Sequence, residues 1–488
     1  MTIFTRRIVF YVSWKRFLLR EGTYEALRKA YITAFIAAVL TRVLLPFALC
    51  ETQFVNSLIF AIVALFGAAV VCLDLFTRRV FLTAKNVGWL AAFLLVCAIS
   101  SAINAKYGII GNVRNLVWLA ISFFLLYTID PKRTIDNVKN EIKYVGNILI
   151  AVCFLACGAS LAMFALQVGY YVDVYPDSFA RMGFIEGRLF GVFEDPNYAA
   201  VAAMVAIIYS IFNLKNAEKK WLKAFYIGGI IVDFCYIVLS GSRTTEVAAI
   251  IVVFLAAYFL LLKKYDNVKA NVHFKQIALV LASMLCIAVL IFSFIFGRKA
   301  LGYLPEVVGA QFTAVSVAEQ KPRRHIDITR DDVSNSADIS NCRFKIWRSA
   351  LELFKSKPIF GVSPRNMRTY AKTAFPKGFI AQRSYAVHNA YLDVLTSTGL
   401  LGAVLMFIFL LKYVIDAFKF LFVKMDNKNY TLVLFSFINV ATVAISAFFL
   451  SEIFFVSTIG VLTFWMNLGY SYHFINGSAT QENAGGAV

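Results

Sequence analysis

The stretch SYAVHNAYLDVLTSTGLLGAVLMFIFLL, residues 384–411, passes from polar and aromatic residues into a long apolar run. The run 390–411 is long enough to cross the roughly 30 Å hydrocarbon core of a bilayer as a helix. His388 and Asn389 therefore lie directly before the N-terminal end of a predicted membrane span. The chain has only four histidines, so a histidine at the start of a membrane span is unusual. Its role depends on the segments that would surround it.

The rest of the chain repeats the apolar pattern. Of the 488 residues, 60% are hydrophobic, and the mean hydropathy is +0.72, whereas soluble domains are roughly 45–50% apolar. The sequence therefore predicts an all-α polytopic membrane protein with about twelve transmembrane helices. The predicted spans are 31–50, 54–73, 87–104, 109–127, 147–168, 197–212, 225–240, 244–262, 276–296, 390–411, 430–450 and 453–473.

The net charge of +20 is distributed in a way that argues against nucleic-acid binding. With the N-terminus inside, the short segments facing the cytoplasm hold 26 Lys and Arg residues, and the short outer segments hold four. This is the positive-inside pattern of membrane proteins, and it predicts that both termini are cytoplasmic. The basic, aromatic N-terminal segment is typical of a helix that lies on anionic lipid.

These predictions divide the chain into five parts. They are a basic interfacial segment (1–30), nine spans with an external loop at 169–196 (31–296), a large external loop (297–388), three further spans (389–473) and a disordered cytoplasmic tail (474–488).

The large external loop between the ninth and tenth spans is basic, with 16 Lys and Arg residues against seven Asp and Glu. Loops of this length are often functional, so we interpret the excess charge as a site for an anionic ligand at the outer membrane surface. Within the loop, Phe344, Trp347, Leu351 and Phe354 recur at helical spacing. They predict an amphipathic helix beside the bundle.

By this topology, Arg188, Arg243, Arg343 and Arg365 all fall on the outer side. Arginine binds phosphate bidentately and stays charged at any relevant pH. Arginines converging at a bilayer surface would suit the diphosphate of a lipid-linked donor and stabilise the charge that develops as it leaves. No spacing typical of a metal site is visible, so we expect no metal and no other cofactor.

Two further arginines, Arg42 and Arg114, lie inside predicted spans. Long basic side chains near the end of a span can reach the interface, or they can pair inside the bundle. We therefore expect neither of them to belong to the site.

Two residues could accept a proton from an attacking hydroxyl. His388 has an ordinary pKa near 6.5 and could act as a general base, or it could instead hydrogen-bond phosphate at the helix N-terminus. Glu452, between the last two spans, is an alternative base if burial raises its pKa. The competing interpretation of Glu452 is an exposed turn residue.

Four segments together resemble a known family, the bacterial O-antigen ligase/polymerase superfamily. They are RLFGVFEDPNYAA (188–200), LSGSRTTEVAA (239–249), NCRFKIWRSALELFKSKPIFGVSPRN (341–366) and HNAYLDVLTSTGLLG (388–402). They occur in the order typical of the family, with the large loop between spans nine and ten. The first five spans are similar to the family only as generic apolar helices.

The resemblance implies a helical (GT-C-like), metal-independent glycosyltransferase of the bacterial cytoplasmic membrane. Such enzymes transfer a glycan from undecaprenyl diphosphate at the outer, periplasmic face. Carried over to matching positions, the resemblance implies diphosphate or glycan contacts for a set of arginines and polar residues, with His388 as base or phosphate partner. The set comprises Arg188, Asn197, Arg243, Arg343, Arg365, Asn389 and Tyr391.

The acceptor remains open, because the family transfers glycans to a lipid A core, to another lipid-linked repeat unit or to protein hydroxyls. We favour a carbohydrate acceptor, and thus a polymerase or ligase of O-antigen, capsule or exopolysaccharide. The competing class is a transporter, such as a lipid-linked oligosaccharide flippase. Against it, the notable polar residues gather on one membrane face, whereas carriers bind near the midplane between repeated halves. An insertion at 306–340 has no role that the sequence reveals.

Overall fold

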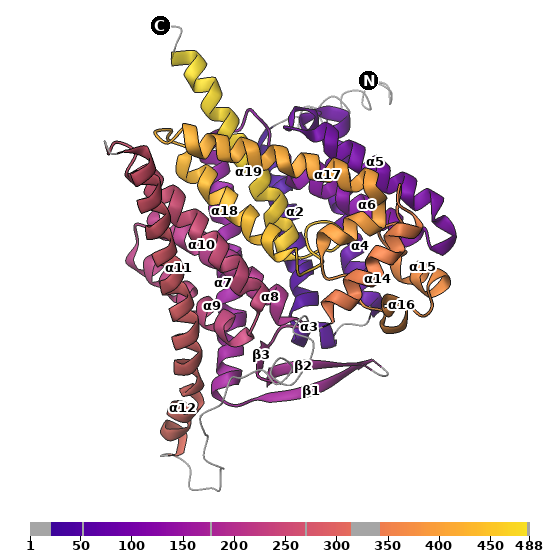
Figure 1. The fold of residues 1–488 in the computed structure, drawn as a ribbon, viewed down its shortest axis with the longest axis horizontal. Coiled ribbons are helices and arrows are strands. Elements are labelled where there is room, and N and C mark those ends of the chain that lie inside the picture. Colours follow the sequence, from indigo (N-terminus) through magenta and orange to yellow (C-terminus); the bar gives the residue numbers. More distant parts are fainter. Residues whose placement is uncertain (1–20, 51–52, 176–177, 269–270, 314–341, 486–488) are drawn as a thin grey trace, which may run out of the picture.

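The computed structural model describes residues 21–50, 53–175, 178–268, 271–313 and 342–485, and these are mostly helical (Figure 1). The predicted spans all coincide with helices. The first six helices of the bundle are α2 (Glu21–Val43), α3 (Leu45–Cys50), α4 (Gln53–Thr77), α5 (Val87–Ile103), α6 (Ile110–Ile121) and α7 (Ile135–Ala165). The middle four are α8 (Pro196–Lys215), α9 (Lys220–Ser240), α10 (Arg243–Lys264) and α11 (Val272–Gly302). The last three are α17 (Ala390–Val423), α18 (Tyr430–Ser446) and α19 (Ile459–Gly485).

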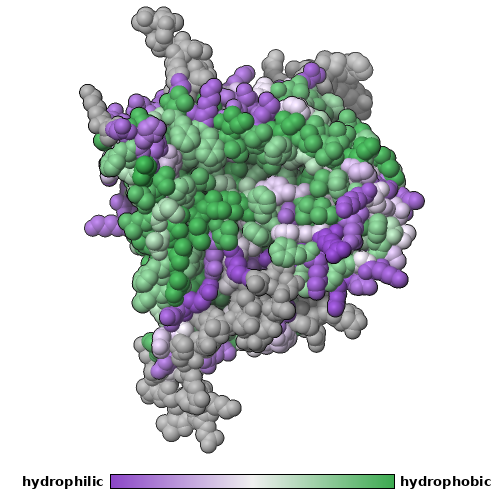
Figure 2. All heavy atoms as spheres, viewed as in Figure 1, coloured by the Kyte–Doolittle hydropathy of each residue, from purple (hydrophilic) through white to green (hydrophobic). Residues whose placement is uncertain are grey.

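Seven helices in the described part of the chain are long and apolar enough to cross a membrane by length and composition. They include the 38-residue stretch Val272–Gly309 and the 34-residue helix α17. Three shorter apolar helices accompany them, at Val87–Ile103, Ile110–Leu126 and Tyr430–Ser446. Figure 2 shows a broad apolar belt on this face, with hydrophilic residues along its upper edge. The chain is thus a multi-pass membrane protein, and a total of twelve spans stays a prediction.

The all-α prediction is incomplete, because the loop predicted at 169–196 folds into a three-stranded antiparallel sheet. Its strands are β1 (Gly169–Tyr175), β2 (Ser178–Ile185) and β3 (Arg188–Gly191). Glu186 and Gly187 form the two-residue turn between the last two strands, both with positive φ, as tight hairpin turns require. The segment 169–191 is therefore a folded element that brings Arg188 close to the start of α8.

The first span and the sheet are joined by main-chain hydrogen bonds. The Leu45 N–H donates to the Val192 carbonyl at 2.8 Å, and the Glu194 N–H donates to the Val43 carbonyl at 3.0 Å. Because these bonds hold the end of α2 against the segment before α8, Arg42 lies beside Glu194.

The described residues of the large loop that follow the insertion contain three short helices, α14 (Arg343–Ser356), α15 (Met367–Ala374) and α16 (Phe379–Arg383), beside α17 (Figure 1). The predicted amphipathic helix is confirmed as α14, but its predicted apolar face is wrong. Phe344 and Leu351 are exposed, while Ile346, Ala350 and Leu353 are buried. The small Ala350 side chain permits close approach to α17, which a phenylalanine ring would prevent.

The segment after α14 docks into a kink of α17. Gly399 interrupts that helix with φ +66°, and the freed Thr396 and Ser397 carbonyls accept the N–H groups of Val362 and Ser363, each at 2.9 Å. A Cβ on Gly361 would lie 2.4 Å from the Ser397 carbonyl carbon, so only glycine permits this approach. The docking places the chain from Arg365 onward against the bundle.

Two terminal predictions have different outcomes. The disordered tail expected at 474–488 is wrong for most of its length, since α19 continues to Gly485. The helical hydrogen bonds of α19 evidently propagate beyond the apolar part of its sequence. The predicted interfacial segment lies mostly outside the described residues, and so does most of the 306–340 insertion, which begins inside α12 (Leu304–Thr313).

Candidate functional site

Three helices begin at the site, and each starts with a capping side chain. Asp195 accepts from the Asn197 N–H at the start of α8, which also has Pro196 in its first turn. Ser242 caps α10, and Asn389 caps α17. Short polar side chains at these positions satisfy the first N–H groups of a helix. The positive ends of the helix dipoles favour bound anions.

A cavity of about 230 Å³ lies between the N-terminal ends of α8 and α19. Its wall contains Arg42, Glu194, Asp195, Tyr198 and Glu452, together with residues 456–460 of the turn that leads into α19. The cavity therefore combines one guanidinium with three carboxyl groups, which is a set of groups suited to proton transfer beside a bound anion.

Glu452 is the most buried of these carboxyl groups, with 2% of its surface exposed. Its oxygens accept hydrogen bonds from the hydroxyls of Ser446 (3.1 Å) and Thr458 (3.3 Å). Burial raises the pKa of Glu452 to about 7, and the hydrogen bonds from Ser446 and Thr458 oppose that shift. The interpretation as an exposed turn residue is wrong, because the turn folds inward against α19.

His388 lies just before α17, half-buried, in the left-handed conformation with φ +51°. Its N–H donates to the Ser451 hydroxyl at 3.1 Å, which holds it beside the turn that carries Glu452. Burial and the nearby guanidinium groups of Arg343 and Arg368 lower the pKa of His388, while Asp195 opposes the shift. The imidazole is therefore neutral at pH 7 and can accept or donate a hydrogen bond.

A chain of hydrogen bonds links Arg188 through Asn197 to Asp195 in the cavity wall. The Arg188 Nη2 donates to Asn197 Oδ1 at 2.9 Å, and its Nε donates to the Ser240 carbonyl at 2.9 Å. Asn197 in turn donates through Nδ2 to Asp195 at 3.0 Å. Because Ser240 is the last residue of α9 and Arg243 the first of α10, these two arginines lie at one helix junction next to the cavity wall.

Arg343 and Arg365 reach the site from the large loop. Arg343 begins α14 and lies over the ring of Phe449, with its Cζ 5.7 Å from the ring centroid. The Arg365 Nη1 donates to the Phe455 carbonyl at 3.4 Å, and the backbone N–H of Arg365 donates to Asn112 Oδ1 at 3.0 Å. Both arginines therefore contact the turn region between α18 and α19 that forms one side of the cavity.

Arg365 has three further arginines as neighbours. Desolvation and the guanidinium groups of Arg114, Arg42 and Arg368 lower the pKa of Arg365, and Asp393 opposes the shift. The expectation that Arg42 lies outside the site is wrong, because Arg42 lines the cavity. Tertiary packing of α2 against the sheet brings it there.

Asn389 and Tyr391 have partners within the protein. Asn389 Oδ1 accepts from the N–H groups of Tyr391 and Leu392, both at 3.0 Å. The Tyr391 hydroxyl donates to the Ala444 carbonyl at 2.7 Å. These contacts fix the start of α17 beside α18, and a direct contact of either side chain with substrate stays a prediction.

Sequence reasoning missed several residues of the site. Glu194 and Asp195 both line the cavity, while Arg181 pairs with Glu186 at 3.1 Å. Burial and Asp195 raise the pKa of Glu194, while Arg42 opposes the shift. The signal that could have identified Asp195 was its position before Pro196, as a helix cap.

The fold and the site define a multi-pass membrane protein in which a small cavity combines Arg42 with three carboxyl groups, and further arginines lie next to its walls. Residues 228–407 match the model of a family described as O-Antigen ligase (Wzy_C). The match covers less than half of the chain and supports a likeness to the O-antigen ligase/polymerase superfamily. It includes Arg243, Arg343, Arg365 and His388, whereas Arg188 and Glu452 lie outside it. The search of curated proteins gives no match.

Proposed function

We propose that the protein transfers or polymerises a glycan from undecaprenyl diphosphate onto a carbohydrate hydroxyl at the outer face of the bacterial cytoplasmic membrane. The observation that carries the proposal is a cavity that holds Arg42 and a buried carboxyl group with a pKa near 7. Arg343, Arg365 and His388 are held against the turn that forms one of its sides. An anionic leaving group and a proton acceptor are the two requirements of such a transfer.

In the proposed reaction, an acceptor hydroxyl attacks the anomeric carbon of the donor sugar. The new glycosidic bond forms as the bond from that carbon to the diphosphate oxygen breaks, and undecaprenyl diphosphate leaves with the electron pair. The hydroxyl proton passes to Glu452, whose pKa suits a general base near neutral pH. Preorganised positive groups, including Arg188, Arg243 and Arg343, would stabilise the charge that develops on the diphosphate.

His388 is the second candidate for the base. It is neutral at pH 7 because its pKa is lowered, so it could instead donate a hydrogen bond to a diphosphate oxygen. A base with a lowered pKa and one with a raised pKa give different pH profiles, which allows the two assignments to be separated.

Release of undecaprenyl diphosphate from a panel of lipid-linked oligosaccharides tests the proposal in nanodiscs, with and without a metal chelator. We expect release by the wild type in chelator, and strong loss in Arg243→Ala and Glu452→Gln. Arg348→Ala is the matched control, because Arg348 is exposed on the outer side of α14, with 87% of its side chain accessible. Movement of intact donor across liposomes without release would contradict the proposal and favour a transporter.

A further inference from the structure

A second and larger cavity, of about 700 Å³, lies farther along α19, beside its middle residues. It is lined by Lys85 in the turn before α5, by the residues at the start of α7, by Lys428 and Asn429 before α18, and by residues 469–477 of α19. Gly460 of α19 lines the first cavity and His473 lines the second. At 1.5 Å per residue they lie about 20 Å apart along the helix. The larger cavity is therefore distinct from the candidate active site.

The lining of this cavity is basic. It contains Lys85, Arg133, Lys139 and Lys428, and its one carboxylate is Asp136. Lys139 pairs with Asp136 at 3.2 Å. In the part of the chain that the structure describes, neither Lys85 nor Lys428 has an ion-pair partner. The cavity thus retains positive charge that the surrounding protein does not balance.

Two helices also begin at this cavity. Thr134 caps the 31-residue helix α7 by accepting from the Asn137 N–H, and Thr134 and Ile135 line the cavity. Asn429, which precedes the first residue of α18, lines it too. Helix N-termini attract negative charge, so their fields add to those of the lysines in the same enclosed volume.

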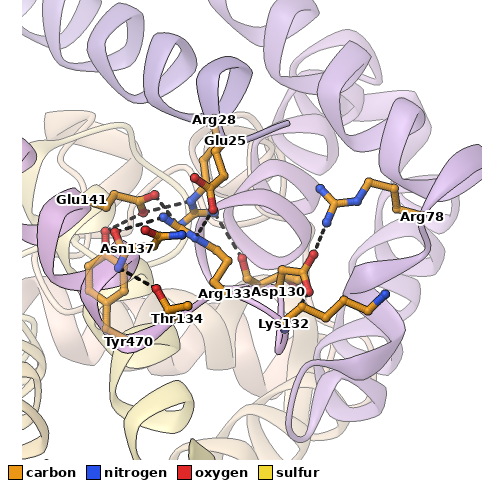
Figure 3. A network of polar contacts seen from close by, with 11 residues as sticks. Glu25, Arg28, Arg78, Asp130, Lys132, Arg133, Thr134, Asn137, Glu141 and Tyr470 are labelled. Carbon is orange, nitrogen blue, oxygen red and sulfur yellow. Dashed lines mark hydrogen bonds and ion pairs between the residues drawn. The ribbon is translucent and has the colours of Figure 1, made fainter. Parts of the chain in front are cut away.

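One wall of the cavity is held by a buried charge network (Figure 3). Glu141 pairs with Arg28 at 3.0 Å and with Arg133 at 2.8 Å, and it accepts from the Tyr470 hydroxyl at 2.8 Å. Arg133 also pairs with Glu25 at 2.9 Å. Because Arg133 and Glu141 belong to the end of the loop before α7 and to α7 itself, the network fixes this wall before any ligand binds.

We propose that this cavity binds a phosphate-bearing ligand, either the headgroup of an anionic lipid or a water-soluble phosphorylated molecule. Its volume falls within the roughly 300–1,000 Å³ of small-molecule sites. Lysine ammonium groups attract phosphate as point charges. Helix N-termini provide backbone N–H groups that donate hydrogen bonds to it. The proposal goes beyond glycosyl transfer and does not depend on it, because binding is measured without turnover.

The test compares two sources of phosphate on the full-length protein. One arm measures binding of phosphatidylglycerol against phosphatidylcholine in nanodiscs by native mass spectrometry. The other titrates soluble sn-glycerol 3-phosphate against the detergent-solubilised protein. The variant is Lys85→Gln with Lys428→Gln, and the matched control is Lys220→Gln with Lys223→Gln, which removes the same charge from the first turn of α9.

We expect the double variant to lose affinity roughly 30-fold in the arm that shows binding, from the usual worth of two lysines near an anionic surface, while the control changes less than about twofold. Binding of phosphatidylglycerol alone would assign a lipid headgroup, and binding of glycerol 3-phosphate would assign a soluble ligand. No binding in either arm, or an equal loss in the control, would overturn the proposal.

A cavity-filling variant tests whether binding is lost because the cavity is blocked or because the protein is misfolded. Gly477 faces the cavity, and the nearest atom to a Cβ placed there is Ile135 Cδ1 at 3.9 Å. Gly477→Trp should block the ligand without removing charge. If this variant elutes as a single species and still binds phosphate like the wild type, the cavity is not the binding site.

Discussion

Two buried glutamates beside α19 differ in their partners. Next to the middle of the helix, Glu141 is fully enclosed and balanced by Arg28 and Arg133, with a hydrogen bond from Tyr470. In the turn before the helix, Glu452 is nearly as buried, but its direct partners are the neutral hydroxyls of Ser446 and Thr458. A carboxylate with paired cations stabilises the fold, whereas one without them can change its protonation state during a reaction.

The largest expected effect comes from Glu452→Gln. If Glu452 is the general base, this change should lower turnover about 10²–10⁴-fold while leaving thermal stability close to that of the wild type, because a neutral amide replaces a carboxyl that is partly protonated at pH 7. Undecaprenyl diphosphate release and the unfolding temperature measure the two quantities. Glu186→Gln, on the exposed hairpin, serves as control. Unchanged turnover would remove Glu452 from the mechanism.

The same comparison predicts a loss of stability for Glu141→Gln. Removing Glu141 from the buried network leaves Arg28 without a counter-charge and Arg133 with Glu25 as its remaining partner, at a cost of about 3–5 kcal/mol. We expect a lower unfolding midpoint in detergent, with turnover per folded molecule preserved. Asp136→Asn is the control, since the exposed pair Asp136–Lys139 contributes less than about 1 kcal/mol. Equal stability of the two variants would contradict the structural role of Glu141.

A smaller effect is expected from Gly460→Ala. The new Cβ would lie 2.4 Å from Glu452 Oε1, so the carboxyl group must move out of its hydrogen bonds to Ser446 and Thr458. Such overpacking costs about 1–3 kcal/mol, and we expect a roughly tenfold or greater loss of turnover from the misplaced group. Gly158→Ala, where the nearest atom lies 4.0 Å from the new Cβ, should be neutral in the same assay.

The pH profile of kcat/KM sharpens the choice of base and needs no substitution. A base must be deprotonated, so activity rises with pH through its pKa in the free enzyme. With Glu452 as base, the midpoint should lie near 7. With His388 as base it should lie below 6.5, because the pKa of His388 is lowered. A midpoint well below 6.5 that persists in Glu452→Gln would transfer the role to His388.

The contribution of Glu452 to the stability of the fold should fall as the pH rises, whereas activity should rise. Its pKa is about 7 in the folded protein against an ordinary value of 4.5, so the folded state binds more protons between these values. The contribution of this group is therefore full below about pH 4.5 and declines as the pH rises toward 7. Unfolding midpoints of wild type and Glu452→Gln, compared across this window, measure the difference.

Much of the fold follows from the sequence alone. Apolar runs of about 20 residues can only bury their backbone polar groups as helices in lipid, so all predicted spans coincide with helices. Local capping chemistry likewise explains why Asp195, Ser242 and Asn389 start helices. The sheet at 169–191 was missed because short strands with few turn signals carry little pattern in a chain dominated by apolar helices.

The candidate site was predicted only in part. Arg188, Arg343, Arg365, His388 and Glu452 were chosen because the predicted topology puts them on one side of the membrane. The structure places Arg343, Arg365 and His388 against the turn that carries Glu452, whereas Arg188 approaches the cavity through Asn197 and Asp195. The cavity positions of Arg42 and Asp195 could not be assigned in advance, since topology orders residues along one axis only. Their distance across the membrane plane depends on how α2, the sheet and α8 pack together.

By itself, the sequence determined that this chain is a helical, multi-pass membrane protein with a long basic loop at 297–388, because hydrophobic length and charge are properties that composition carries directly. Only the tertiary structure decided which charges meet. Glu141 and Glu452 are both glutamates near the ends of apolar helices, and nothing local distinguishes them. Arginines from α2 and the loop before α7 reach the first, and hydroxyls from α18 and its following turn reach the second. Those neighbours make one carboxylate structural and the other available for chemistry.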